Sequence, residues 1–516
     1  MVVLHKVVVK PRRSSRPARF FGAITTILRT TFFNLNCVEY KMTSNNFEHQ
    51  TDLNHWDEET DIIVVGSGFA GLSAAIEAKQ AGSSVIVLEK RESCGGNSII
   101  SGGVLAAIHP DRQQKEGIQD SAQLMYEDML KAGRGANDPN LVRLVTNNSY
   151  QTLQWLIQEL DVQFMDRIDQ CGGHSVPRCY TPPQVSGLPI IEPLLAQAKK
   201  LGITIKTQAL FKTLYQNREG KIEGVGIDSP LSSSQNSENI SSIKAKKAVI
   251  LASGGFSGDN GFKINQGITS VDDIDMTTLP NTTAEVLVEA MRLGVKTVDM
   301  SQLQLLPCAS PDEKGHVTAA FFGSYVVFPY GIMVNPTTGK RFVNEWADRK
   351  TRSDSMLAIG KPSIGITDVA GLKNAGDMLN KYVDGHIVRE FGQLTELATF
   401  YEIPYENLRG SLIRYNHYVK NRKDEEFQKI IRLCAKPIQP PYYAIRLWPK
   451  AHCTMGGIKI NTKAQAITET GEVLKGLYAA GEVTGGVHGV SRLAGCAITE
   501  CLVFGRIAGQ NAAKIS

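Results

Sequence analysis

Residues 61–71 read DIIVVGSGFAG and contain three glycines, Gly66, Gly68 and Gly71, at the spacing G-x-G-x-x-G. The apolar run before the turn predicts a buried parallel strand, and LSAAIEAKQAG after it has apolar residues at helical spacing. Gly66 permits the tight turn, Gly68 lets a pyrophosphate approach the backbone, and Gly71 lets helix and strand pack closely. The helix N-terminus offers N–H groups and a partial positive charge to phosphates. This turn therefore predicts dinucleotide binding.

The second strand and three later segments indicate which dinucleotide is bound. SVIVLEK (84–90) reaches Glu89, whose carboxylate can take both hydroxyls of an adenosine ribose. Small-residue segments follow at 94–103, in VILASGGF (249–256) and in GLYAAGEVTGGVHG (476–489). An NAD site needs only the first fingerprint, whereas FAD-dependent oxidoreductases use the additional strand ends to hold the ribityl chain and the isoalloxazine. The combination therefore favours FAD.

The formal charge of +5 comes from the N-terminal segment of the 516-residue chain. Residues 1–41 hold eight Lys or Arg and one acid, which leaves a net charge of −2 for the rest. A chain with this balance, and without a basic stripe with interleaved aromatics, is not a nucleic-acid binder by charge. No stretch reaches the ~18 apolar residues that a membrane span needs.

Three interpretations of residues 1–41 are open. The segment could be a transit peptide, because it contains Arg and Ser and few acids. It could be a secretion signal, although Arg29 interrupts the apolar run and no small-residue cleavage site follows. It could also be an extension that precedes a true start at Met42, which we favour. A start at Met42 predicts a cytoplasmic protein, and a genuine targeting segment predicts a periplasmic or organellar one.

The nine cysteines are scattered and form no recognisable ligand set. There is no CxxCH haem attachment, no CxxC pair and no ferredoxin-like spacing, so we expect no metal site and mostly reduced, buried thiols. A flavoprotein without haem or iron–sulfur ligands must take its electrons from a second substrate or an external donor. A cytochrome c, an FMN protein or reduced flavin would serve.

The periodicity along the chain predicts an α/β protein in which one domain is inserted into another. The expected order is an N-terminal extension (1–57), a first part of the FAD domain (58–300), a clamp or substrate domain (301–453) and a second part of the FAD domain (454–516). The expected elements are helices at 121–133, 141–160 and 281–294, strands at 203–216 and 221–227, a Ser/Asn-rich loop at 229–242, a hairpin at 331–350, helices to about 435, and strands from 452 to a last helix at 495–514.

Four segments together resemble the fumarate reductase/succinate dehydrogenase flavoprotein superfamily, in its branch of flavocytochrome c fumarate reductases and urocanate reductases. They are GSGFAGLSAAIEA, GKRFVNE with the following arginine, the TMGG turn, and AAGEVTGGVHGVSRLAG. The resemblance implies a Rossmann-like FAD-binding domain (GR2-type) split by an inserted α+β clamp (capping) domain that closes over the flavin. It also implies that flavin N5 delivers hydride to the β carbon of an α,β-unsaturated carboxylate.

The resemblance assigns roles to individual residues. Arg349, after GKRFVNEWAD, matches the arginine that protonates the α carbon, and Arg492, in VSRLAG, matches the arginine that holds the carboxylate. The expected substrate-binding residues are Leu306, Ser324, His452, Cys453 and Arg492. The expected cofactor contacts, with FAD bound non-covalently, are Gly66, Gly68, Ala70, Gly71, Glu89, Lys90, Gly96, Asn97, Ser98, Gly102, Gly103, Leu210, Ser253, Gly254, Glu285, Glu482, Ala497 and Ile498.

Four departures from the family pattern bear on the substrate. Leu306 replaces the His of a His-Pro pair, and Gly323-Ser324-Tyr325-Val326-Val327 replaces Thr-Glu-x-x-Arg. Cys453 stands where a His precedes TMGG, and Ala494-Gly495-Cys496 replaces Gly-Gly-Asn. The first two remove donors for a second carboxylate and the Glu and Arg of a proton relay, and leave Leu306, Phe321, Phe322, Val327 and Phe328. We therefore expect an aryl or alkyl acrylate-type monocarboxylate rather than fumarate.

Alternatives to these assignments are also open. Arg349 could instead pair with Glu345 on a surface helix, and Arg492 could bind a backbone carbonyl in a loop. If the 307–330 segment aligns differently, Tyr325, Tyr330 or Asp348 could relay the proton. Competing functions are a ketosteroid dehydrogenase-like desaturase of a ketone or acid, which would use a tyrosine pair, and a non-catalytic flavin electron-transfer subunit.

Overall fold

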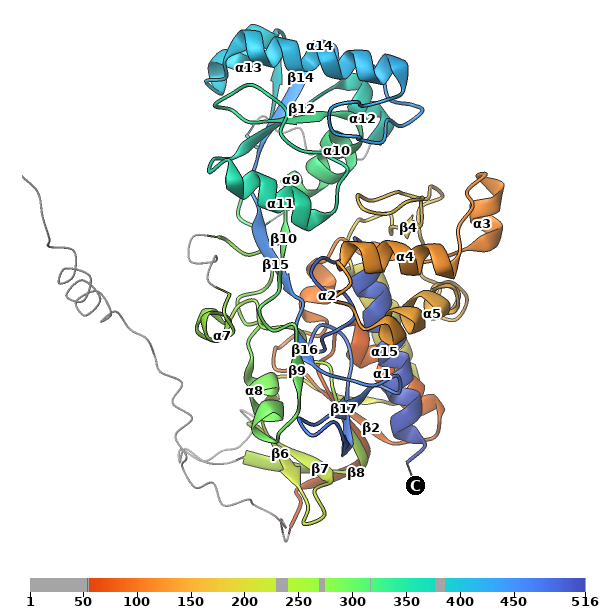
Figure 1. Cartoon of the computed structure of the whole chain (residues 1–516). Coiled ribbons are helices and arrows are strands. Elements are labelled where there is room, and N and C mark those ends of the chain that lie inside the picture. The colour runs from red at the N-terminus through yellow and green to blue at the C-terminus, as the bar shows by residue number, and fades with distance from the viewer. Residues whose placement is uncertain are drawn as a thin grey trace, which may run out of the picture. The chain divides into compact units, whose positions relative to one another are not determined.

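Apolar strands from widely separated parts of the sequence build a mainly parallel sheet (Figure 1). Its order is β17-β18-β8-β1-β2-β5, and β1 pairs in parallel with both β2 and β8. An antiparallel pair, β6 and β7, adds to β8. The strands are β1 (Glu58–Val65), β2 (Val85–Leu88), β5 (Thr204–Lys206), β6 (Leu210–Gln216), β7 (Ile222–Asp228), β8 (Ile240–Leu251), β17 (Gln465–Ile467) and β18 (Val473–Ala479).

The computed structural model describes residues 53, 55–228, 240–268, 274–315, 317–375 and 386–515, all within the unit formed by residues 48–516. The segment at 1–41 and most of the Ser/Asn-rich loop at 229–242 lie outside the described residues. Among the described helices, none is both long enough and apolar enough to span a bilayer.

Two long helices, α1 (Phe69–Gln80) and α15 (Cys496–Ala513), pack closely beside this sheet. A Cβ on Gly505 would lie 2.4 Å from the carbonyl oxygen of Ala70, and one on Gly509 would lie 2.2 Å from that of Ala74. The two helices can therefore approach only because these positions lack side chains. Further helices on this part of the chain are α2 (Gly96–Ile100), α4 (Ala122–Ala132), α5 (Pro139–Gln158), α6 (Leu188–Lys200) and α8 (Glu285–Arg292).

A second, antiparallel sheet has the order β11-β12-β14-β13. Alternate residues of its strands enter two different apolar clusters: Met333 and Ile445 face one, and Ile332 and Ala444 face the other. This alternation is the two-residue period of a strand covered on both faces. The elements are β11 (Ile332–Val334), β12 (Ser363–Asp368), β13 (Val388–Phe391), β14 (Tyr442–Leu447), a π-helix (Phe322–Val327), α11 (Arg349–Ala358), α12 (Val369–Ala375), α13 (Leu394–Phe400) and α14 (Tyr405–Asn421).

An antiparallel pair of strands, β10 (Leu303–Leu306) and β15 (Lys450–Thr454), carries the chain to the second sheet and back (Figure 1). The split α/β fold expected from the sequence is confirmed in this respect, because there are two sheets with separate apolar clusters and the chain passes between them through the paired strands β10 and β15. The domain boundaries at 300/301 and 453/454 stay predictions.

The expectation of helices alone between the hairpin and about residue 435 was wrong, since β12 and β13 lie there. The sequence of β12, SIGITD, alternates isoleucine with small or polar residues, but the alternation covers only two isoleucines, a run too short to separate a strand from a helix by periodicity. The hairpin at 331–350 is confirmed at its turn, where Asn335 N–H donates to the Lys340 carbonyl at 2.9 Å. Its returning arm is reduced to one bridge between Val334 and Arg341.

Candidate active site

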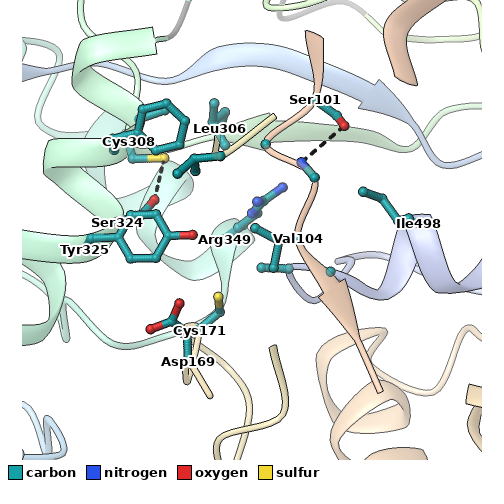
Figure 2. A pocket seen from close by; sticks show the side chains of 18 of the residues that line it. Ser101, Val104, Asp169, Cys171, Leu306, Cys308, Ser324, Tyr325, Arg349 and Ile498 are labelled. Atoms are coloured by element: carbon teal, nitrogen blue, oxygen red, sulfur yellow. Dashed lines mark hydrogen bonds between the residues drawn. The ribbon is translucent and has the colours of Figure 1, made fainter. Parts of the chain in front are cut away.

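A cavity of about 710 Å³ is lined by helices, loops and the strand pair β10 and β15, outside the strands of the two larger sheets. One wall comes from the segment after β2, from α15 and from the loop before it, and the other from β10, the π-helix and α11 (Figure 2). Predicted site residues that line it are Asn97, Ser98, Gly102, Gly103, Leu306, Ser324, Arg349, His452, Cys453, Glu482, Arg492, Ala497 and Ile498. Those that do not line it are Gly66, Gly68, Ala70, Gly71, Glu89, Lys90, Gly96, Leu210, Ser253, Gly254 and Glu285.

The glycine-rich turn has the geometry that a pyrophosphate site requires. Gly66 has φ +108°, and a Cβ there would lie 2.2 Å from the carbonyl oxygen of Ala252. Gly68 is the N-cap of α1 and supplies no side-chain cap. In the first turn the Phe69 N–H donates to Ser98 Oγ at 3.1 Å, which leaves the N–H groups of Ala70 and Gly71 for an anion. A Cβ on Gly71 would lie 1.9 Å from the Gly66 carbonyl oxygen, which explains the third glycine.

The backbone is open at two further predicted cofactor positions. Gly96 (φ +47°) and Gly254 (φ +83°) have positive φ, and a Cβ on either would meet no atom within 4 Å. Each position therefore combines a backbone that favours glycine with empty space beside it, as expected where a ligand lies against the main chain. These residues fit a flavin dinucleotide.

The acidic residues predicted to contact the cofactor already have protein partners. Glu89 accepts hydrogen bonds from the Ser67 N–H (3.3 Å) and hydroxyl (2.5 Å) and from the Arg91 N–H (2.9 Å). A carboxylate has about four acceptor sites, so Glu89 can still accept ribose hydroxyls. Glu285 pairs with Lys90 at 2.6 Å, which lowers the pKa of Glu285 although burial opposes this.

Arg349 is the first residue of α11 and reaches into the cavity (Figure 2). Burial, and secondarily the charge of Arg492, lowers the pKa of Arg349 to about 10. Its buried Nη1 has no hydrogen-bond partner among the described residues. The alternative pairing with Glu345 is wrong, because that carboxylate binds Arg341 at 2.7 Å and lies 3.6 Å from Lys429.

Arg492 lies in the loop before α15 and faces the same cavity. Its N–H donates to Gln304 Oε1 at 2.7 Å, and its Nη1 donates to the Leu493 carbonyl at 3.3 Å. The alternative in which Arg492 binds a backbone carbonyl therefore holds for Nη1. The buried Nε has no partner among the described residues and remains a donor for an anion.

A hydrogen bond between neighbours of the two arginines brings them together. The Ser491 hydroxyl donates to Asp348 Oδ1 at 3.1 Å, and Asp348 also caps α11 by accepting from the Lys350 and Thr351 N–H groups. Each arginine directly follows one of the bonded residues, Asp348 or Ser491. Residues far apart in the sequence thus present two guanidinium groups to one cavity.

The predicted substrate-binding residues face the cavity from three different elements. The Ser324 hydroxyl donates to Cys308 Sγ at 3.2 Å, and His452 Nδ1 lies 2.7 Å from Thr277 Oγ1. Leu306 is 3% exposed at the end of β10. Phe321 and Phe328 also line the wall, whereas Phe322 and Val327, expected beside them, are buried behind it.

Several lining residues were not predicted. Arg352 lies over the Phe328 ring at 4.2 Å, and burial lowers its pKa. Its position three residues after Arg349 puts both on one helix face, a signal that could have identified it. Asp169 and Cys171 come from a segment without regular periodicity, so the sequence held no comparable signal for them.

Comparison with known proteins places this geometry in a family. The FAD binding domain family model matches residues 61–498. The chain is 38% identical to the acrylate reductase flavoprotein subunit of Shewanella woodyi, over 88% of this chain and 91% of that one. It is 34% identical to fumarate reductase (cytochrome) of Shewanella frigidimarina, over 89% and 78%.

A solved structure agrees with these sequence relatives. The open conformation of a flavocytochrome c3 fumarate reductase superposes with a TM-score of 0.70 at 31% identity, over 89% of this chain and 79% of that one. The family match, the named relatives and the fit of the glycine-rich turn lead to one conclusion. This chain belongs to the FAD binding domain family and is an FAD-dependent oxidoreductase of the fumarate reductase/succinate dehydrogenase flavoprotein superfamily.

Proposed function

We propose that this protein reduces the C=C bond of an α,β-unsaturated monocarboxylate with an aryl or alkyl tail, using non-covalently bound FAD. The observation that carries the proposal is a single cavity lined both by the two arginines and by the apolar side chains of Leu306, Phe321 and Phe328. The similarity to a protein named acrylate reductase supports the same substrate class.

The arrangement suggests a role for each arginine. When FAD is bound, its reduced form supplies hydride for the β carbon. Arg492 would hold the substrate carboxylate through charge-assisted hydrogen bonds. Arg349 would give a proton to the α carbon as negative charge develops there. An arginine is a poor acid in water, but burial already lowers its pKa to about 10, which makes this transfer easier. We further propose that residues 301–453 act as a clamp over the substrate.

Fumarate fits the apolar part of this lining poorly. Its second carboxylate would lie against Leu306 and two phenylalanine rings, which offer no hydrogen-bond donors. Burying a charge without donors costs several kcal/mol, whereas an aryl or alkyl tail would gain from the same contact. The nearby Arg352 is already stacked on Phe328, and its Nε donates to the Asp348 carbonyl at 3.5 Å.

A desaturase remains the second candidate, because Tyr325 and Tyr330 both line the cavity. Such an enzyme would take hydrogen from a saturated ketone or acid and reduce the flavin. Arg349 and Arg492 would then have no role in the chemistry. The direction of flavin chemistry with each substrate class separates the two functions.

The test is anaerobic mixing of the full-length holoprotein with a panel of substrates. Reduced protein is mixed with acrylate, crotonate, cinnamate and fumarate, and oxidised protein is mixed with 3-ketosteroids and saturated acids. The proposal predicts reoxidation by the enoate monocarboxylates and no flavin bleaching by the saturated compounds. Bleaching by a 3-ketosteroid, without reoxidation by any enoate, would establish the desaturase instead.

The proposal includes an external electron donor, because the sequence has no haem or cluster motif. A cytochrome c, an FMN protein or free reduced flavin would fill this role. Measuring the rate of flavin reduction by each donor class, with cinnamate as acceptor, would identify which one supports turnover.

A further inference from the structure

The cavity extends beyond Arg349 to a polar group in the irregular segment before β4 (Cys179–Tyr180). Asp169 of this segment lies 3.2 Å from Arg167, and the Arg167 Nη1 donates to the Ala375 carbonyl at 2.7 Å. In Figure 2 the Tyr325 hydroxyl points toward Arg349, and the Asp169 carboxylate lies directly below that hydroxyl. All three side chains line the same cavity.

A buried arginine that gives up a proton must be recharged from solvent before the next turnover. Of the alternatives, Asp348 is fully engaged, since its oxygens accept from Lys350, Thr351 and Ser491. The Tyr330 hydroxyl already accepts from Cys434 Sγ at 3.7 Å. Tyr325 is the hydroxyl that Figure 2 shows directed at the guanidinium.

We propose that Tyr325 and Asp169 form the proton path from solvent to Arg349. This rests on the proposed role of Arg349 as the acid. Asp169 suits the solvent end of such a path. Its side chain is 15% exposed, and it pairs with Arg167, whose side chain is 38% exposed. One Asp169 oxygen, Oδ2, is buried without a hydrogen-bond partner among the described residues and can carry a proton.

The electrostatics of both groups agree with this role. Burial raises the pKa of Asp169 above its ordinary value, against the opposing charges of Arg167 and Arg432. Burial, and secondarily Asp169, raises the pKa of Tyr325 well above 10, so the phenol keeps its proton until a neighbour replaces it. The titratable and charged groups around the pair are Glu116, Arg167, Cys171, Cys179 and Arg432.

The proton balance of the step is simple. An N–H bond of Arg349 breaks as the C–H bond forms at the α carbon. The Tyr325 O–H proton then moves to the neutral guanidine, while the Asp169 carboxylic acid proton replaces it on the phenol oxygen. Asp169 finally takes a proton from water, so the cycle consumes one solvent proton and moves no electrons.

The first test is single-turnover reoxidation of the reduced holoprotein by cinnamate and, separately, by ferricyanide. Ferricyanide removes electrons without protonating a carbon, so it reports FAD binding and fold. Tyr325→Phe and Asp169→Asn should slow the cinnamate reaction by about 100-fold, the scale of general acid catalysis, with the ferricyanide rate unchanged. Tyr443→Phe is the matched control, because that hydroxyl donates to Glu390 outside the cavity.

The outcomes separate this inference from the proposed function. If Arg349→Lys keeps full activity, the proposed acid is wrong and the path fails with it. If Arg349→Lys is inactive but Tyr325→Phe and Asp169→Asn react normally, only the path is refuted. A loss in Tyr330→Phe that matches the loss in Tyr325→Phe would also overturn it.

A second readout distinguishes a proton carrier from a merely structural salt bridge. The wild-type cinnamate rate should fall as pH rises through the pKa of Asp169, and Asp169→Asn should lose this limb. Infrared difference spectra of the oxidised protein should show a protonated carboxyl band that titrates over the same range and disappears in Asp169→Asn. An unchanged pH profile in Asp169→Asn would refute the path.

Discussion

Leu306→His tests whether the apolar wall sets the substrate preference. Leu306 ends β10, is 3% exposed and lines the cavity. A second carboxylate placed against it leaves buried acceptors unpaired, which costs about 1–3 kcal/mol. Since about 1.4 kcal/mol corresponds to a factor of ten, wild-type protein should be reoxidised by cinnamate or acrylate at least about tenfold faster than by fumarate.

A histidine at 306 has a volume similar to leucine and adds an N–H donor to this wall. The ratio of the cinnamate rate to the fumarate rate should therefore fall by about tenfold, which is the stabilisation of one hydrogen bond to a charged group. The assay is anaerobic stopped-flow reoxidation of dithionite-reduced protein at several concentrations of each acid. FAD content and the thermal melting curve of each variant report whether the fold is retained.

Leu306→Met is the matched control for Leu306→His, because it changes the shape of the wall without adding a donor. It can alter both rates, but their ratio should stay near the wild-type value. A wild-type protein that prefers fumarate would refute the apolar-wall argument. An unchanged ratio in Leu306→His, with FAD content intact, would show that the substrate tail does not reach residue 306.

Three other predictions concern the arginine acid, the flavin and the stability of the second sheet. Arg349→Lys keeps the charge but not the planar donor array, so enoate turnover should fall by more than about tenfold, a barrier of about 1.4 kcal/mol, at unchanged FAD content. Acid precipitation should release free flavin into the supernatant, since Cys94–Ser98 holds no histidine for a covalent link; flavin in the pellet would contradict this. Glu345→Gln should destabilise the protein by about 3 kcal/mol in urea unfolding, because Lys429 loses its buried carboxylate and Arg341 is left with Asp424. The same Arg341 charge lowers the pKa of Glu345 despite burial, so its stabilisation is complete above its ordinary pKa of 4.5 and is lost as pH falls below that value; equal acid sensitivity of wild type and variant would refute the assignment.

The local elements were readable from the sequence because their signals are local. The glycine-rich turn, β1 and α1 occupy adjacent residues, and their periodicities switch within a few positions. The same holds for α15 and for the strands at 204–228. β12 was missed because its alternation of isoleucine with small or polar residues covers only two isoleucines, which is too short a signal to identify a strand.

Part of the site could also be inferred before the fold was known. Arg349 and Arg492 stand in motifs that match a family on both sides, so their common site was expected and the cavity contains both. The sequence could not show what holds them together. The hydrogen bond between Asp348 and Ser491 joins two loops whose distance apart in the chain carries no periodic signal.

The sequence by itself determined the cofactor class and the α/β architecture, because glycine spacing and apolar runs depend on a residue's immediate neighbours. Only the tertiary structure decided which polar residues face the cavity. Asp169 is one example: it lies in an irregular segment, and it lines the same cavity as Tyr325 and Arg349 only because long-range packing brings three separate segments of the chain to that cavity. Burial then changes the acidity of these groups, and burial depends on the whole fold rather than on the sequence around each residue.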